Sequence, residues 1–234
     1  MAGSERQLVT AEGEPDADGL PAGNRRPRDP LQRRSQAERR AATQRALIEA
    51  AIEILNERGF NAATAVAVAE RAGVTRGAVQ HHFGTTQALL VAVMRHVSRA
   101  RDERAQPTPR APAPLSGRVR ALIQEYRLLY DGPDGVALME IWLGAGHDED
   151  LRQQVDALMQ RITERRLDHW RSVLADVALS DAEIVTLRGV MVSTLRGAAI
   201  HRVLSRNPNQ AAAQVDLFCA MTEAWLVRRG PAAG

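Results

Sequence analysis

Lysine is absent from this chain of 234 residues, and cysteine occurs only once, at Cys219. A single cysteine excludes a disulfide framework and a cluster of thiolate metal ligands, so we expect a reducing, cytoplasmic setting. No apolar run reaches the roughly 18–20 residues that a membrane-spanning helix needs. The N-terminus is acidic and polar and lacks the apolar segment of a signal peptide. These absences favour a cytoplasmic protein that has no membrane partner.

The usual sequence signatures of catalysis are also lacking. The chain has no glycine-rich phosphate loop and no Gly-x-Ser-x-Gly nucleophile turn. The run Asp148 to Asp150 could imitate paired carboxylates, but acids at a predicted helix N-terminus also favour the helix dipole. His81 and His82 are neighbours on a predicted helix and diverge by about 100°, so they are poorly placed to share a metal ion. We therefore expect no enzyme, no metal site and no cofactor.

Charge is distributed unevenly along the chain, although the net charge is only +3. Residues 1–24 carry one arginine and five acids, a net charge of −4. Residues 25–104 carry fifteen arginines and eight acids, a net charge of +7, and residues 105–234 are balanced. A basic N-terminal third joined to a neutral remainder is typical of a DNA-binding module with an attached sensor or assembly module.

The stretch TAVAVAERAGVTRGAVQHHFGTTQALL, residues 64–90, predicts a helix, a tight turn at 72–74 and a short second helix. A helix over 75–82 is too short to be stable alone. It must be held by packing, with Val79 and Phe83 turned inward and the polar side chains outside. This is the pattern of a helix-turn-helix whose second helix enters a DNA major groove.

Apolar residues at helical spacing predict an all-α fold, and no segment shows the alternation of a strand. In the first helix of the motif, after the N-cap Thr64, the expected inner face includes Val66, Val68 and Ala69. Ser180 and Glu183 match a helix capping box. We expect helices over about 38–58, 65–71, 75–82, 86–104, 115–130, 136–144, 149–177, 181–206 and from 209 onward.

These patterns suggest the following domain organisation. Residues 1–34 are expected to be a disordered arm, first acidic and then arginine-rich. Residues 35–104 form the helix-turn-helix domain, 105–114 with four prolines form a linker, and 115–230 form a second helical domain. Eight arginines lie between positions 25 and 45. They are either a solvated linker or a basic arm that follows DNA phosphates, and the adjoining motif favours the arm.

The segment GFNAATAVAVAERAGVTRGAVQHHFGTTQALLVAV, residues 59–93, resembles the TetR family of bacterial transcriptional regulators. The residues that carry the resemblance stand in the family's order and spacing; they are Gly59-Phe60, Thr64, Val68-Ala69, Ala72-Gly73-Val74, Gly77, His82-Phe83 and Leu89-Leu90. The segment MEIWLGAGHDEDLR, residues 139–152, looks like one seen in a subset of these regulators. The resemblance implies a homodimer, a palindromic double-stranded DNA operator, and a C-terminal domain for effector binding and dimerisation.

On the predicted recognition helix we expect Arg76 to contact guanine, with a phosphate contact as the alternative. His81 is expected on phosphate or base, whereas His82 packs internally. The family often has Tyr at the position of Gln80 and Lys at that of Thr86, so this chain lacks two usual phosphate contacts. Gln80 can instead pair with adenine. The full set of expected DNA-binding residues is Arg39, Arg40, Thr64, Thr75, Arg76, Gly77, Gln80, His81, Thr85 and Thr86.

Large or polarisable side chains of the second domain are either its core or the lining of an effector pocket. They are Tyr126, Tyr130, Met139, Trp142, His169, Trp170 and Met191. A pocket so lined favours a small, mostly apolar effector. We expect a repressor that such an effector releases from its operator. The alternatives are an effector-independent activator, a non-specific DNA-binding protein, and an interaction protein that has lost DNA binding.

Overall fold

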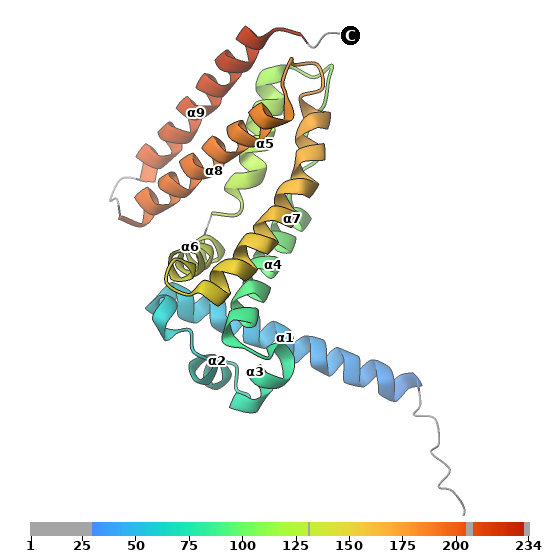
Figure 1. Ribbon diagram of the computed structural model, residues 1–234, viewed down its shortest axis with the longest axis vertical. Coiled ribbons are helices and arrows are strands. Elements are labelled where there is room, and N and C mark those ends of the chain that lie inside the picture. The colour runs from blue at the N-terminus through green and yellow to red at the C-terminus, as the bar shows by residue number, and fades with distance from the viewer. Residues whose placement is uncertain (1–29, 131, 205–207, 232–234) are drawn as a thin grey trace, which may run out of the picture. The chain divides into compact units, whose positions relative to one another are not determined.

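A computed structural model describes residues 30–130, 132–204 and 208–231, and nearly all of their regular structure is helical (Figure 1). The exception is an isolated β-bridge between Val177 and Pro231. The helices are α1 Pro30–Arg58, the 3-10 helix η1 Phe60–Ala62, α2 Ala65–Arg71, α3 Arg76–Phe83, α4 Thr86–Arg104, α5 Leu115–Arg127, α6 Pro133–Ala145, α7 Glu149–Val173, α8 Asp181–Leu204 and α9 Pro208–Arg229. The expected all-α fold is confirmed.

Helix α1 begins at Pro30 rather than near Glu38, so the predicted start is wrong. Proline is well suited to the first turn of a helix, because its missing N–H has no partner there in any case. The arginines, glutamines and alanines that follow have high helix propensity. The last part of the predicted arm, residues 30–34, is therefore helical, and the remainder, residues 1–29, lies outside the described residues.

Side-chain caps fix several helix starts where the sequence predicts them. The Thr64 hydroxyl accepts a hydrogen bond from Ala67 N at 3.2 Å, and the Thr85 hydroxyl accepts one from Ala88 N at 3.0 Å. At the start of α8, Ser180 N donates to Glu183 Oε2 at 2.9 Å and Glu183 N donates to Ser180 Oγ at 3.3 Å. The predicted capping box is confirmed. Each cap satisfies backbone groups that a helix end would otherwise leave unpaired.

The chain divides by its contacts after Arg39, within α1, and the second unit, residues 40–234, contains the motif and every later helix. Within this unit the proline-rich segment 105–114 separates α4 from α5, as expected. It does not separate the hydrophobic cores. One core joins Leu55 of α1 and Val79 of the motif to residues of α6 and of the first half of α7.

Contacts between η1, α4, α6 and the start of α7 attach the motif to the rest of the unit. Phe60 N donates to Glu140 Oε2 of α6 at 2.8 Å. Gly144 has no side chain where the Phe60 ring packs; a Cβ there would lie 2.2 Å from two ring carbons. Asp148 caps α7 through Leu151 N and also accepts from Gln87 Nε2 of α4 at 2.9 Å. The segment 139–152, singled out in the sequence, therefore lies against the motif.

A second core fills the space among α5, α7, α8 and α9. Its largest fully buried side chains are Leu122, Tyr126, Met191, Leu195 and Leu226. Helices α8 and α9 lie side by side, and α9 also packs on α5 (Figure 1). Among the described residues, no helix is long and apolar enough to cross a membrane.

Candidate nucleic-acid interface

The turn between α2 and α3 has the geometry that the sequence predicts. Gly73 adopts φ +68°, a conformation that costs glycine little and other residues more. Val74 N donates to Ala69 O at 2.9 Å, and Gly73 N donates to Glu70 O at 3.1 Å. These bonds close the C-terminal end of α2. They set the direction in which α3 leaves the turn.

Helix α3 presents one apolar face and one polar face. Val79 is 2% exposed and Phe83 packs against the first core, whereas Arg76, Gln80 and His81 are exposed. The short helix is therefore held by packing, as predicted. In α2, however, Val66 is 42% exposed, so its assignment to the inner face is wrong. Two residues along a helix turn by about 200°, which places Val66 opposite the buried Val68.

A surface hollow of about 470 Å³ brings together the starts of α2, α3 and α4. Its lining residues are Ala65, Arg76, Gly77, Val79, Gln80, Gly84, Thr85 and Thr86. Five of these are predicted DNA-binding residues, and Thr64 and Thr75 directly precede α2 and α3. Ala65 and Gly84 were missed. Gly84 was nevertheless a signal in the sequence, because a glycine that follows a helix allows a close approach of the backbone to a partner. In the structure it ends α3 with φ +80°.

The threonines of this surface fall into two kinds. The oxygens of Thr64 and Thr85 accept from backbone N–H groups, but each hydroxyl keeps its own hydrogen for donation to a phosphate. The Thr75 side chain makes no capping bond at the start of α3. Thr86 is the first residue of the 19-residue helix α4. A phosphate at that helix end would meet unpaired amides and the positive end of the dipole.

Several basic residues around the motif have different surroundings. Arg76 is exposed and forms no ion pair with any described residue. Arg71 is bound instead to Glu53 at 2.9 Å and to Glu57 at 2.7 Å, which directs it away from a DNA role. Arg39 is exposed on α1, in the first unit. Arg40 belongs to the second unit, and its charge acts on His82.

The surroundings of His82 disfavour its protonated form. Its Nδ1 is buried and finds no hydrogen-bond partner among the described residues. Burial lowers the pKa of His82 below its usual 6.5, and the nearby His81 and Arg40 lower it further. The two histidine rings meet edge to face, with centroids 5.2 Å apart. The His82 ring is thus partly buried and contacts the rings of His81 and Phe83, in keeping with the internal position that the sequence predicts.

Acid is expected to destabilise the protein partly through His82. An unfolded chain protonates this residue near pH 6.5, whereas the folded protein resists protonation because its pKa is lowered. This part of the stability is present above about pH 6.5 and is lost as the pH falls below it. The midpoint of thermal unfolding should fall less between pH 7.5 and 5.5 in His82→Gln than in wild type or in His81→Gln. Equal slopes for all three proteins would refute this role.

The seven predicted pocket residues do not share one cavity. Trp170 and Met191 line an apolar cavity among α5, α7, α8 and α9, together with Leu122, Phe218 and others. This cavity has a volume of only about 10 Å³. The indole N–H of Trp170 is buried and has no acceptor among the described residues. An apolar ligand would have to separate the helices to enter.

Tyr130, Met139 and Trp142 do not line this cavity: Tyr130 precedes α6, and Met139 and Trp142 belong to α6. The Tyr130 hydroxyl accepts from Arg196 Nε at 3.2 Å, and the Arg196 guanidinium lies 3.6 Å from the centre of the Trp142 ring. Burial raises the pKa of Tyr130, so the phenol stays neutral. Met139 is partly buried against the second core. Tyr130 and Trp142 are thus both in contact with the Arg196 guanidinium.

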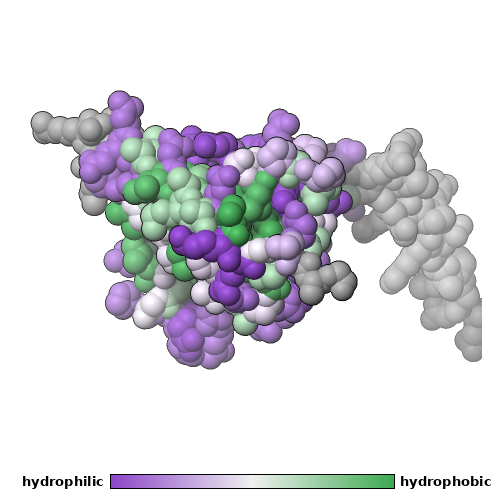
Figure 2. Space-filling view, turned by 90° about the horizontal axis from the view of Figure 1, so that it is seen from above, coloured by the Kyte–Doolittle hydropathy of each residue, from purple (hydrophilic) through white to green (hydrophobic). Residues whose placement is uncertain are grey.

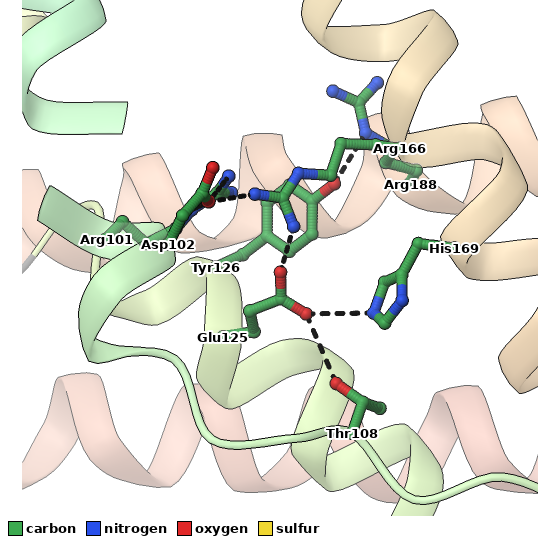
Figure 3. A network of polar contacts seen from close by, with 8 residues as sticks. All are labelled: Arg101, Asp102, Thr108, Glu125, Tyr126, Arg166, His169 and Arg188. Atoms are coloured by element: carbon green, nitrogen blue, oxygen red, sulfur yellow. Dashed lines mark hydrogen bonds and ion pairs between the residues drawn. The ribbon is translucent and has the colours of Figure 1, made fainter. Parts of the chain in front are cut away.

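Tyr126 and His169 belong to a network of charged side chains (Figure 3). The guanidinium carbons of Arg101, Arg166 and Arg188 lie 5.5, 6.0 and 5.7 Å from the centre of the Tyr126 ring. Arg188 Nε also donates to the Tyr126 hydroxyl at 2.9 Å. Cations over an aromatic face are attracted by its quadrupole, and burial of the ring strengthens this attraction.

Glu125 is at the centre of the network and was not predicted. Its side chain is 6% exposed and accepts hydrogen bonds from Arg166, from Thr108 at 3.3 Å and from His169 at 3.1 Å. The sequence did contain a signal. Glu125 stands three residues after the buried Leu122, on the face of α5 that should be apolar. An acid at such a position requires buried partners.

The family model of bacterial regulatory proteins, tetR family, matches residues 47–93. The regulator CymR of Pseudomonas putida is 27% identical over 175 residues, which cover 75% of this chain and 86% of CymR. The regulator BetI of Vibrio parahaemolyticus is 31% identical over 145 residues, which cover 59% of this chain and 70% of BetI. Both relatives are described as regulators of the helix-turn-helix type.

Solved structures show the same fold. A transcriptional regulator from Rhodococcus superposes on this chain with a TM-score of 0.62 at 21% sequence identity. The matched region covers 82% of this chain and 99% of the Rhodococcus chain. A transcriptional regulator from Saccharomonospora viridis, in complex with choline, superposes with a TM-score of 0.57 at 13% sequence identity. The matched region covers 82% of this chain and the whole of the Saccharomonospora chain. At these identities the likeness concerns the fold.

Proposed function

Since the chain belongs to the TetR family and is a helix-turn-helix DNA-binding transcriptional regulator, we propose that it is a repressor released from a palindromic operator by a small molecule. The observation that carries this proposal is the hollow that joins the starts of α2, α3 and α4. Arg76 and Gln80 offer hydrogen bonds to base edges there, and Thr85 and Thr86 offer them to a phosphate. Phosphate contacts fix the position of the helix, and base contacts select the sequence.

Two copies of the motif are needed to bind a palindrome, and we propose that α8 and α9 form the dimer contact. These helices expose large apolar side chains: Val185, Val190 and Ile200 on α8, and Leu217, Met221 and Val227 on α9, each 41–63% exposed. Figure 2, seen from the end where α9 finishes, shows hydrophobic patches among hydrophilic residues. Packing against a second copy would bury such faces and place recognition helices about 34–36 Å apart.

The effector site belongs to the helical region after α4 in this proposal. Relatives of the same fold support a small molecule as effector, since one of them holds choline. The apolar cavity beside Trp170 and Met191 supports a ligand that is mostly apolar, although it is closed at about 10 Å³. Binding there would favour a conformation in which the helices around the second core have separated. An effector of this kind shifts the population of conformations away from the one that binds DNA.

The test of DNA recognition is a selection of bound genomic fragments by the purified protein, repeated with Arg76→Ala. Wild type should enrich a palindromic motif. The variant should lose discrimination at one symmetric base pair, because a bidentate arginine–guanine contact contributes about 1–3 kcal/mol of discrimination. The exposed Arg110 of the proline-rich segment 105–114 provides a control, and Arg110→Ala should select the wild-type motif.

Other outcomes of this selection would contradict the proposal in distinct ways. Duplex binding without an enriched motif would indicate a non-specific DNA-binding protein, in keeping with the absence of the family's usual Tyr and Lys at Gln80 and Thr86. No duplex binding at low salt would indicate an interaction protein. Uniform weakening by Arg76→Ala, with the motif unchanged, would assign Arg76 to a phosphate instead.

A further inference from the structure

A cavity of about 340 Å³ lies where α4, α5 and α7 meet, apart from the closed apolar cavity. Its lining residues are Ser98, Arg101, Asp102, Ala105, Glu125, Ile162, Arg165, Arg166 and His169. Pockets for small molecules have volumes of about 300–1,000 Å³, so this space is large enough for a small organic ligand without any separation of helices. Most of its lining residues are charged. The charges therefore decide which ligand can enter.

The two acids of the cavity are already fully engaged. Glu125 is bound by Arg166, His169 and Thr108, and Asp102 is bound by Arg101 and Arg166 (Figure 3). A cationic ligand would find no carboxylate without a partner, and it would meet three guanidinium groups at short range. Like charges in a partly buried space repel strongly because water screens them poorly. The cavity is therefore unsuited to a cation.

The bases of the cavity exceed its acids. Arg101, Arg165 and Arg166 carry three positive charges against the two carboxylates, and His169 can add a further donor. Arg165 is exposed at the cavity and forms no ion pair with any residue that the structure describes. Guanidinium groups match carboxylates in shape and can donate two parallel hydrogen bonds to them. Arg165 is therefore the cation of this cavity that is available to a negatively charged ligand.

We propose that this cavity binds a small organic monocarboxylate, with Arg165 as its principal partner, and that this anion is the effector of the proposed repressor. The inference rests on that proposed function. It places the effector in this cavity rather than in the closed apolar one beside Trp170 and Met191, and it changes the expected chemistry of the effector from mostly apolar to an acid with an apolar body. Ile162 and Ala105 provide apolar contacts for the body of the ligand.

The position of the cavity explains how an anion would affect DNA binding. The last turns of α4 form one wall, and the first residue of the same helix, Thr86, lies in the DNA-facing hollow. Arg166 of α7 holds α4 through Asp102. A carboxylate beside Arg165 competes with Asp102 for Arg166, and Asp102, being 51% exposed, is readily solvated when released. The tie between α4 and α7 then weakens, and the start of α4 is free to move.

Calorimetric titration of the full chain with benzoate tests the site without DNA. Benzoate should bind with a Kd of about 1 mM or tighter, while the neutral benzamide, the cation benzylammonium and inorganic phosphate at equal ionic strength should bind much more weakly. Arg165→Met should weaken benzoate binding about tenfold, because a charge-assisted hydrogen bond is lost. Arg161→Met provides the matched control, since Arg161 is an exposed arginine of α7 that does not line the cavity.

The anion proposal is overturned if benzoate fails to bind, if benzamide binds as tightly, or if Arg165→Met and Arg161→Met have the same affinity for benzoate. Tighter binding of phosphate would assign the site to inorganic anions and also overturn it. Failure of the repressor proposal can be distinguished from failure of the anion proposal. In that case the DNA selection would enrich no motif, whereas benzoate would still bind. If both hold, saturating benzoate should weaken operator binding about tenfold, and operator should weaken benzoate binding by the same factor.

Discussion

Replacing Gly144 with alanine is expected to lower the thermal midpoint and to weaken binding to operator DNA. A Cβ at this position would lie 2.2 Å from two ring carbons of Phe60, so the ring must move. The backbone N–H of Phe60 donates a hydrogen bond to Glu140, and this bond restricts the movement of the ring. Overpacking of this kind costs about 1–3 kcal/mol, which lowers the thermal midpoint of a protein of this size by about 2–12 °C. Differential scanning fluorimetry and fluorescence anisotropy with labelled operator measure the two effects.

The effect on DNA binding has a separate physical reason. Phe60 belongs to η1, which is joined to α2 by Ala63 and Thr64, so a displaced ring changes how the motif packs on α6. Gly117→Ala provides the control, because a Cβ there meets no atom within 4 Å. That change should be neutral or slightly stabilising. The double variant Phe60→Leu/Gly144→Ala should recover part of the loss. If Gly144→Ala is as stable as Gly117→Ala, the close packing of Phe60 on α6 is not important for stability.

Asp176→Asn is expected to destabilise the protein by about 2–3 kcal/mol, because it leaves a buried guanidinium without its counter-charge. Arg118 is 3% exposed and donates to both carboxylate oxygens of Asp176, at 2.6 and 2.8 Å, and to Val173 O at 2.6 Å. Its Nε has no partner among the described residues, so few alternatives exist for its charge. Chemical denaturation at pH 7 measures the loss.

The pH dependence gives an independent check on this ion pair. The hydrogen bonds from Arg118 lower the pKa of Asp176 below its usual 3.8. A carboxyl group with a lowered pKa contributes stability that is present above about pH 4 and is lost as the pH falls through the folded-state value. The difference between wild type and Asp176→Asn should therefore shrink in acid. Asp181→Asn, which removes the exposed pair with Arg171, should cost less at pH 7. Equal losses in the two variants would contradict the special role of Arg118.

The helix-turn-helix could be derived from the sequence because its signals are local. Threonine caps, the glycine of the turn and the alternation of apolar and polar residues on α3 act within a few residues of one another. They predicted the starts of α2, α3 and α4 and the inward position of Val79. The error at Val66 arose where a helix of only seven residues gave too few positions to define its buried face. The start of α1 was missed because its first residues, from Pro30 to Arg40, are mostly charged or polar and form no apolar stripe.

Tertiary structure alone decided how the motif is joined to the rest of the unit. Phe60 meets Glu140 across 80 residues of sequence, and Gln87 meets Asp148 across 61. No local pattern specifies such pairs, because they depend on where α6 and α7 pack. The same holds for Glu125, Arg166 and Tyr126, whose charges and ring meet only when three helices converge. Sequence periodicity determined which residues are helical and which side chains of α3 stay exposed, and packing between distant helices determined which charges surround a cavity.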